Sequence, residues 1–309
     1  MAAPTAPTGV PAGDIRAVPV RHWGRWASAA LILALAAWLG TAAVGSHAVD
    51  FPTVRRFLFN RTILVGLRNT LLISVLAQAT GVLLGIGFAV MRLSTNPVLS
   101  VSSWVYVWLF RGTPVLVQLI FWFSLPLVFH NLSISVPLVN LTVYRVPMVE
   151  FMTPFKAAFL GLALNEGAYM AEIVRAGILS VDVGQVEASQ ALGMRSSLTL
   201  RRIVLPQAMR VIIPPTGNEF VSMLKTSSLA SVVLYPELLR RAQDIYSTNL
   251  RTLELLVVAS VWYLVLTSIA SVGQYYLERR FARGSARELP LSALGRLRRN
   301  LATIRRRDQ

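Results

Sequence analysis

Six long apolar segments, separated by polar stretches, constrain this chain more than any other feature. Each comes close to or exceeds the roughly 20 residues that an α-helix needs to cross a bilayer. Lipid offers no partner for backbone hydrogen bonds, so only helices suit segments of this length. The sequence therefore predicts an all-α integral membrane protein with about six transmembrane helices. The segments are Trp26–Val44, Ile63–Met91, Thr113–Phe129, Phe155–Leu179, Gln207–Leu234 and Leu253–Leu277.

The composition supports a lipid-embedded chain and excludes several kinds of site. The chain is 54% hydrophobic and only 14% charged, so its apolar surface must face lipid rather than form one water-soluble core. The absence of cysteine excludes disulfides and thiolate chemistry. His22, His47 and His130 share no ligand spacing, so we predict no metal site. No Ser, His and acidic residues form a triad-like pattern, and we predict a protein that is not an enzyme.

The arginines, which give most of the net charge of +16, lie at the ends of the apolar segments. This is the pattern that orients membrane proteins. Six spans place both termini on one side, and the positive-inside rule makes that side cytoplasmic. Its arginines are Arg16, Arg21, Arg25, Arg92, Arg195, Arg201, Arg202, Arg279, Arg280, Arg283, Arg287, Arg305, Arg306 and Arg307. The opposite loops hold Arg55, Arg56, Arg145, Arg240, Arg241 and Arg251, so the bias is incomplete.

The two ends of the chain differ in composition from the middle. Residues 1–20 are rich in Ala, Pro, Thr and Gly, which predicts a disordered cytoplasmic leader. Residues 21–57 hold the first span and an outer loop. The stretch 44–48 resembles a signal-peptide cleavage site, but the apolar run exceeds the ~7–15 residues of a signal core, so we prefer an uncleaved anchor. The Arg-rich tail, residues 284–309, is interpreted as an orienting anchor rather than a binder of anionic lipid or nucleic acid.

A polar, small-residue-rich stretch at residues 182–206 separates the fourth and fifth spans. Asp182 can cap a short helix, with Gln185 in the capping-box position, and Gly193 suits the left-handed residue that ends it. Ser196 or Ser197 can start a second short helix, which we expect Pro206 to close. Geometry alone leaves two interpretations, a docking element for a soluble motor or an ordinary cytoplasmic loop.

An interruption of an apolar stretch marks a membrane interface. The interruption is Arg111-Gly112-Thr113-Pro114, and we expect Arg111 at the cytoplasmic interface with Trp104, Tyr106 and Trp108 as headgroup anchors.

The second span has a face of small residues. Gly81, Gly85 and Gly87 form this face, which allows close packing within the subunit or across a dimer.

Several runs, taken in order, resemble the permeases of the polar amino-acid uptake family of ABC importers. They are Gly66-Leu67-Arg68-Asn69-Thr70-Leu71, Arg111-Gly112-Thr113-Pro114-Val115-Leu116-Val117-Gln118, Ala168-Tyr169-Met170-Ala171-Glu172-Ile173-Val174-Arg175-Ala176-Gly177-Ile178, Ser180-Val181, Gly184-Gln185, Leu224-Lys225 and Ser228-Leu229. Residues 182–206, which we call the coupling loop, resemble the family's EAA loop. The resemblance covers about residues 58–283 and implies a five-helix permease core in a bacterial plasma membrane.

The chain departs from the family pattern at a few positions. Asp182 stands where the family usually has Pro, and Ser189 replaces the second Ala of the EAA triplet. Thr226-Ser227 replaces an acidic residue followed by Thr, so Lys225 loses a charge partner that the family would supply. By resemblance, the residues that couple to the ATPase are Gln185, Glu187, Ala188, Ser189, Ala191, Leu192 and Gly193.

The resemblance also implies partners and an energy source. The chain has no phosphate-binding P-loop, since Lys225-Thr226 follows Leu224 inside an apolar segment. It should bind no cofactor itself, and ATP and Mg²⁺ should be bound by partner ATP-binding subunits. A second permease subunit, identical or a paralogue, and an extracytoplasmic solute-binding protein complete the expected importer. The alternatives are a secondary transporter or channel working alone and, from the basic tail only, a membrane-anchored nucleic-acid binder.

Polar side chains inside the spans are the candidate pathway residues, because charges within a bilayer are costly. Glu166 and Glu219 could meet the ammonium group of an amino acid, and Asn165, Asn218 and Lys225 its carboxylate. Alternatively, each residue ties neighbouring helices together, and Glu166 pairs with Arg or Lys of another helix. Glu172 and Arg175, three residues apart on one helix, are interpreted as a structural pair.

Overall fold

The computed structural model describes residues 23–45, 49–136 and 141–281. The predicted leader and the Arg-rich tail lie outside the described residues. The chain divides into two compact units, Met1–Asp50 and Phe51–Gln309. The first unit contributes α1 (Trp23–Gly45). Trp26, Ile32 and Trp38 of this predominantly apolar helix are at least 65% exposed.

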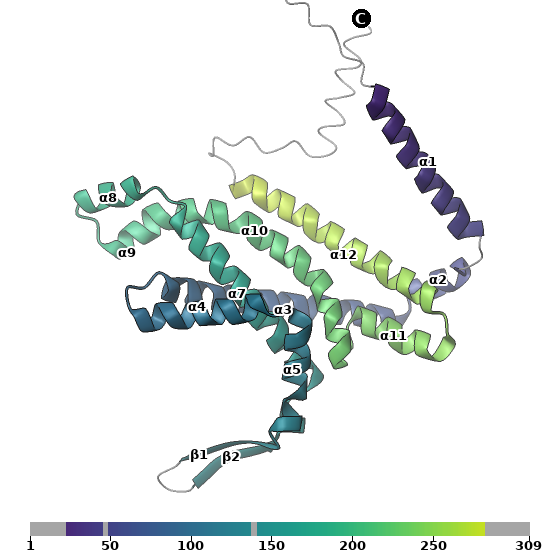
Figure 1. Cartoon of the computed structure of the whole chain (residues 1–309), viewed down its shortest axis with the longest axis horizontal. Helices are drawn as coiled ribbons and strands as arrows, with labels where there is room; N and C mark the ends of the chain where they lie inside the picture. Colours follow the sequence, from purple (N-terminus) through teal and green to yellow (C-terminus); the bar gives the residue numbers. More distant parts are fainter. Residues whose placement is uncertain (1–22, 46–48, 137–140, 282–309) are drawn as a thin grey trace, which may run out of the picture. The chain divides into compact units, whose positions relative to one another are not determined.

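The second unit is almost wholly helical, which confirms the predicted fold class (Figure 1). One antiparallel hairpin, with Asn131 opposite Pro147, was not predicted, because its Val, Ile and Thr residues were assigned to a loop. The elements are α2 (Phe51–Leu58), α3 (Arg61–Arg92), α4 (Pro97–Gly112), α5 (Val115–Val128), β1 (Asn131–Val136), β2 (Leu141–Pro147), α6 (Met148–Phe151), α7 (Pro154–Leu179), α8 (Val183–Ala191), α9 (Ser196–Thr199), a π-helical turn (Leu200–Val204), α10 (Leu205–Thr226), a 3₁₀ segment (Ser227–Val233), α11 (Leu238–Asn249) and α12 (Thr252–Phe281).

Within the described residues, two helices, α3 and α12, are long and apolar enough to cross a membrane on their own. Helices α4 and α5 are long and apolar enough only when taken together, as a pair bent by 103° that forms either one broken span or a re-entrant loop. The expected third span, Thr113–Phe129, is therefore only the second half of a bent apolar pair that begins at Pro97. The break falls at Thr113, whose backbone is extended because the next residue is Pro114.

Close packing of α3 on α7 depends on two of the three glycines singled out in the second span. A Cβ at Gly81 would meet the Glu166 side chain, and a Cβ at Gly85 would meet Met170. Gly87, by contrast, has nothing within 4 Å of such a Cβ. Gly81 and Gly85 therefore let two helices of the same subunit approach closely.

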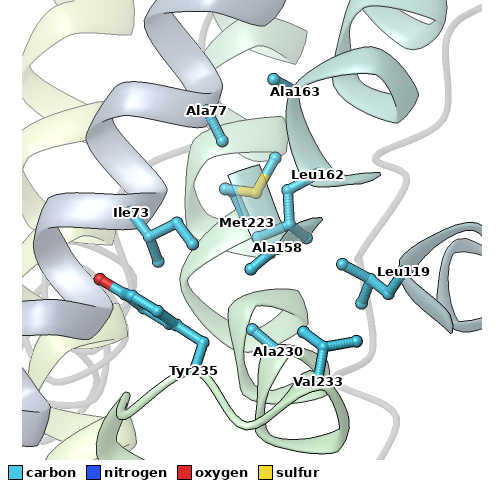
Figure 2. Packing of buried hydrophobic residues seen from close by; sticks show 10 residues of the cluster. All are labelled: Ile73, Ala77, Leu119, Ala158, Leu162, Ala163, Met223, Ala230, Val233 and Tyr235. Carbon is cyan, nitrogen blue, oxygen red and sulfur yellow. The ribbon is translucent and has the colours of Figure 1, made fainter. Parts of the chain in front are cut away.

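A buried apolar cluster joins α3, α5, α7, α10 and the 3₁₀ segment (Figure 2). Leu162 of α7 and Met223 of α10 lie near its centre, and Tyr235 closes one side. This cluster fixes the faces of α7 and α10 that border the cavity described below. Its buried members are Ile73, Ala77, Leu119, Ala158, Leu162, Ala163, Met223, Ala230, Val233 and Tyr235.

A buried carboxylate holds α11 against α3 and α12. Glu237 is 0% exposed and accepts hydrogen bonds from the backbone N–H groups of Leu239 (2.8 Å) and Arg240 (2.6 Å) in the first turn of α11. The Tyr263 hydroxyl of α12 donates to it at 2.6 Å, and the Thr70 hydroxyl of α3 donates at 3.5 Å. The helix α11 is thus fixed at the end of the unit opposite α8 and α9 (Figure 1).

Candidate functional site

A cavity of about 580 Å³ lies at the break between α4 and α5. The break, the middle of α7 and the second half of α10 supply its walls. We call it the first cavity. Its polar lining includes Arg111, Thr113, Asn165, Glu166, Tyr169, Glu219 and Ser222.

Side-chain amides bind the carbonyl groups at the break between α4 and α5. The Gln118 amide of α5 donates to the carbonyl oxygens of Phe110 (2.9 Å) and Thr113 (3.1 Å). The Asn165 amide of α7 donates to the same Phe110 carbonyl at 2.8 Å. The end of a helix leaves carbonyl groups without intrahelical partners, and these amides satisfy them away from water. Asn165 therefore borders the cavity and also fixes the end of α4.

Arg111 lies against the Tyr169 ring, with the guanidinium carbon 4.9 Å from the ring centroid. Tyr169 belongs to the central part of α7, so Arg111 lies beside the middle of that helix, and its expected position at the cytoplasmic interface stays a prediction. Tyr106, which we expected to be a headgroup anchor, is engaged within the subunit instead, because its hydroxyl donates to the Leu164 carbonyl at 2.7 Å and its ring stacks on Phe88. Helix α4 ends inside the bundle, which brings Arg111 to the cavity.

Two carboxylates from different helices line the first cavity, Glu166 of α7 and Glu219 of α10. Glu166 is 4% exposed and accepts a hydrogen bond from the Gln78 amide of α3 at 3.0 Å. Within the described part of the chain, no Lys or Arg forms an ion pair with either carboxylate. The pairing that we considered for Glu166 is therefore not seen among these residues.

The structure does not bring all five candidate pathway residues together. Asn165, Glu166 and Glu219 line the first cavity. Asn218 faces α12 instead and accepts a hydrogen bond from Gln274 at 2.8 Å. Lys225 is exposed and does not line the cavity. Sequence reasoning missed Arg111 and Tyr169 as lining residues, although the Gly-Thr-Pro interruption beside Arg111 was the signal of a broken span.

Glu172 and Arg175 form a two-point ion pair on α7. The guanidinium Nη2 lies 2.9 Å from one carboxylate oxygen, and Nε donates to the other at 3.2 Å. Both side chains are about one-third exposed. The pair borders the region between α4 and α7 and not the first cavity.

The coupling loop begins with the helix α8, whose two ends are both capped. The Asp182 carboxylate accepts a hydrogen bond from the Gly184 N–H at 2.7 Å. At the other end Gly193 has φ +71°, and the Met194 N–H donates to the Ser189 carbonyl at 3.0 Å. This is the Schellman arrangement, which favours glycine because a Cβ is disfavoured at positive φ.

The exposed side of α8 carries most of the expected coupling residues. Leu192 is 81% exposed and Val183 68%, on a segment too polar to cross a membrane. Ser189 is buried instead, with its hydroxyl 2.9 Å from that of Thr199 on α9. The exposed coupling residues are Gln185, Glu187, Ala188, Ala191, Leu192 and Gly193.

The second helix of the coupling loop does not end at Pro206. Helix α9 continues through the π turn Leu200–Val204 into α10, and Pro206 lies in the first turn of α10. The wider turn, in which the Leu205 N–H donates to the Leu200 carbonyl, accommodates a residue without an N–H. The expected helix break is therefore a π turn inside a continuous helix.

The chain is similar to known transport proteins over most of its length. It is 47% identical over 284 residues to the arginine transport system permease protein ArgU of Corynebacterium glutamicum, covering 92% of this chain and 88% of that protein. It is 37% identical over 218 residues to the glutamine transport system permease protein GlnP of Escherichia coli (strain K12), covering 70% and 90%.

A solved structure described as an amino acid ABC transporter with histidines aligns with 75% of this chain and 99% of its own, with a TM-score of 0.64 and 34% identity. Residues 81–283 match the family model described as "Binding-protein-dependent transport system inner membrane component". These matches confirm the predicted resemblance. The chain belongs to this family and is a membrane-embedded permease subunit of an ABC importer.

Proposed function

We propose that this permease carries a cationic amino acid, such as arginine, through the first cavity. The observation that carries the proposal is the presence of two carboxylates, Glu166 and Glu219, in one cavity without an ion pair to a described Lys or Arg. Charges at this depth are costly unless they meet a partner. The relative that transports arginine supports the choice of substrate.

The charges of the first cavity complement the charges of such a substrate. A basic amino acid has two cationic groups and one carboxylate at neutral pH. Glu166 and Glu219 would meet the cationic groups, and Arg111 would meet the carboxylate. The cavity volume, about 580 Å³, falls within the range of roughly 300–1,000 Å³ typical of small-molecule sites.

The coupling loop would dock the ATP-binding subunits, on the side that we assign to the cytoplasm together with both termini. Val183 and Leu192 present exposed apolar side chains there, which a docked subunit would cover. ATP and Mg²⁺ would be bound by those subunits. A second permease subunit would complete the pathway, and a binding protein would deliver the substrate from the opposite side.

The test uses the assembled importer in proteoliposomes that contain ATP. Uptake of labelled arginine should require the ATP-binding subunits and be inhibited by vanadate, whereas a carrier working alone would need neither. Glu166→Gln and Glu219→Gln should each lower arginine uptake at least tenfold. Glu150→Gln, at an exposed glutamate of α6, serves as the matched control. Wild-type uptake by both cavity variants would refute a cationic substrate site at these carboxylates.

A further inference from the structure

A second cavity, of about 520 Å³, adjoins the first between α4 and α7. The two cavities share Arg111, Gly112 and Tyr169, so these residues form the wall between them. The remaining walls of the second cavity include Arg92, Trp108 and the Glu172–Arg175 pair.

The second cavity lies nearer to the coupling loop than the first. Along α7, the first cavity is lined by residues from Leu162 to Tyr169, and the second by residues from Tyr169 to Arg175. Glu166 and Arg175 are separated by about 13 Å along the helix axis, at ~1.5 Å per residue. Helix α7 then continues to Leu179, and α8 begins at Val183. A substrate that moves from the first cavity toward the coupling loop would therefore reach the second cavity next.

The charge of the second cavity is opposite in sign to that of the first. Three guanidinium groups line it, from Arg92, Arg111 and Arg175, against one carboxylate, Glu172. Glu172 is committed to its two-point pair with Arg175. Among the described residues Arg92 and Arg111 are in no ion pair, although the Glu172 carboxylate is close enough to interact electrostatically with both, so the cavity has an excess of positive charge.

The Arg92 and Arg111 guanidinium groups are held in place by contacts weaker than an ion pair. Arg92 Nη1 donates to the Ser100 carbonyl at 3.3 Å, which leaves its other N–H groups for a ligand. Arg111 lies on the Tyr169 ring, a contact that positions the group without neutralising it. Positioned guanidinium groups bind carboxylates through paired, charge-assisted hydrogen bonds.

We propose that the second cavity is a release-side station that binds the α-carboxylate of the transported amino acid. This inference rests on the proposed function of the first cavity. Arg111 lines both cavities, so a carboxylate bound to it can be transferred to Arg92 without losing its last guanidinium contact. The substrate's cationic groups then leave Glu166 and Glu219.

The station should determine how fast bound substrate moves on, whereas the first cavity determines how well it binds. In the assembled importer in phosphatidylcholine vesicles, Arg92→Gln should therefore lower kcat for arginine uptake about tenfold and leave KM within twofold. Arg92→Lys should recover part of the rate, because an ammonium keeps the charge but not the two-point geometry. Arg145→Gln, at an exposed arginine of β2, is the control for loss of a charge elsewhere.

Four results of this experiment would overturn the release-side station. Wild-type kcat in Arg92→Gln, when the wild-type complex takes up arginine, overturns the station alone. Failure of the wild-type complex to take up any cationic amino acid overturns the proposed function and the station together. A rate loss that appears in phosphatidylglycerol vesicles but not in phosphatidylcholine vesicles would assign the cavity to a lipid headgroup. Loss of the ATP-binding subunits from both Arg92 variants would show a structural role and also overturn the station.

Discussion

The Asn165 amide of α7 donates a 2.8 Å hydrogen bond to the Phe110 carbonyl, at the point where α4 ends. Because this bond fixes the residue next to Arg111, Asn165→Ala should displace the guanidinium and leave the Phe110 carbonyl with the Gln118 hydrogen bond alone, at a cost of about 0.5–1.5 kcal/mol. We expect a lower midpoint of thermal unfolding in detergent and slower arginine uptake. Asn131→Ala, at the exposed start of β1, should change neither. Equal stability and uptake in the two variants would show that the bond does not hold the break.

The contact between α3 and α7 can be tested with a pair of glycines on one helix. A Cβ at position 85 would come within 2.8 Å of the Met170 carbonyl carbon and 2.9 Å of the Ala171 nitrogen, both of which are backbone atoms. Gly85→Ala should therefore destabilise the subunit by about 1–3 kcal/mol through overpacking. Gly87→Ala meets nothing within 4 Å and should be neutral or slightly stabilising, since alanine favours helices. Equal midpoints of thermal unfolding for the two variants would contradict this packing.

The coupling loop can be tested at its left-handed residue. Gly193→Val places a β-branched residue at φ +71°, which costs about 1–3 kcal/mol and should unwind the end of α8. We expect normal amounts of permease in the membrane but reduced co-purification of the ATP-binding subunits. Gly193→Asn should be milder, because asparagine tolerates this conformation better than other residues.

Glu187→Arg reverses the charge of an exposed side chain in the middle of α8. Uptake and ATPase retention should both fall relative to Gln190→Ala, a substitution at another exposed position of α8. Full retention and full uptake in both Glu187→Arg and Gly193→Val would show that α8 does not couple the subunits.

The Glu237 carboxylate predicts a dependence of stability on pH. Burial raises the pKa of the Glu237 carboxyl from 4.5 to about 7, against hydrogen bonds that lower it. Between these two values the folded state binds more protons than the unfolded state, so the free energy of unfolding falls as the pH rises. The midpoint of thermal unfolding should therefore decrease from pH 5 to pH 8, and less so in Glu237→Gln. An identical pH dependence in the two proteins would exclude Glu237 as its source.

The helices whose ends are marked by local sequence were predicted well. The second span was expected at Ile63–Met91 and is α3, Arg61–Arg92, because its apolar run and its flanking arginines fix its length. Asp182 and Gly193 bound α8 as expected, because capping depends on residues close together in the chain.

Features that depend on distant contacts were missed. Helix α4 is apolar enough to form part of a span, but it was assigned to a loop because the Gly-Thr-Pro interruption does not show which side of the break enters the membrane. The first cavity unites Arg111, Glu166 and Glu219, which are far apart in sequence and meet only when α4 ends inside the bundle. Asn218 neighbours Glu219 in the chain but faces α12, since adjacent residues of a helix point in different directions.

The helix between the coupling loop and the first cavity has two compliant regions. From Ser196 to Glu219 the backbone is helical without interruption, a rod about 35 Å long at ~1.5 Å per residue. A force on the coupling loop would therefore reach Glu219 of the first cavity through one helix, not through a hinge loop. Regular α-helical hydrogen bonding is lost along this rod at the π turn, residues 200–204, and at the internal prolines Pro214 and Pro215. The stiffness of these two regions would then set how much of a displacement at the coupling loop arrives at Glu219.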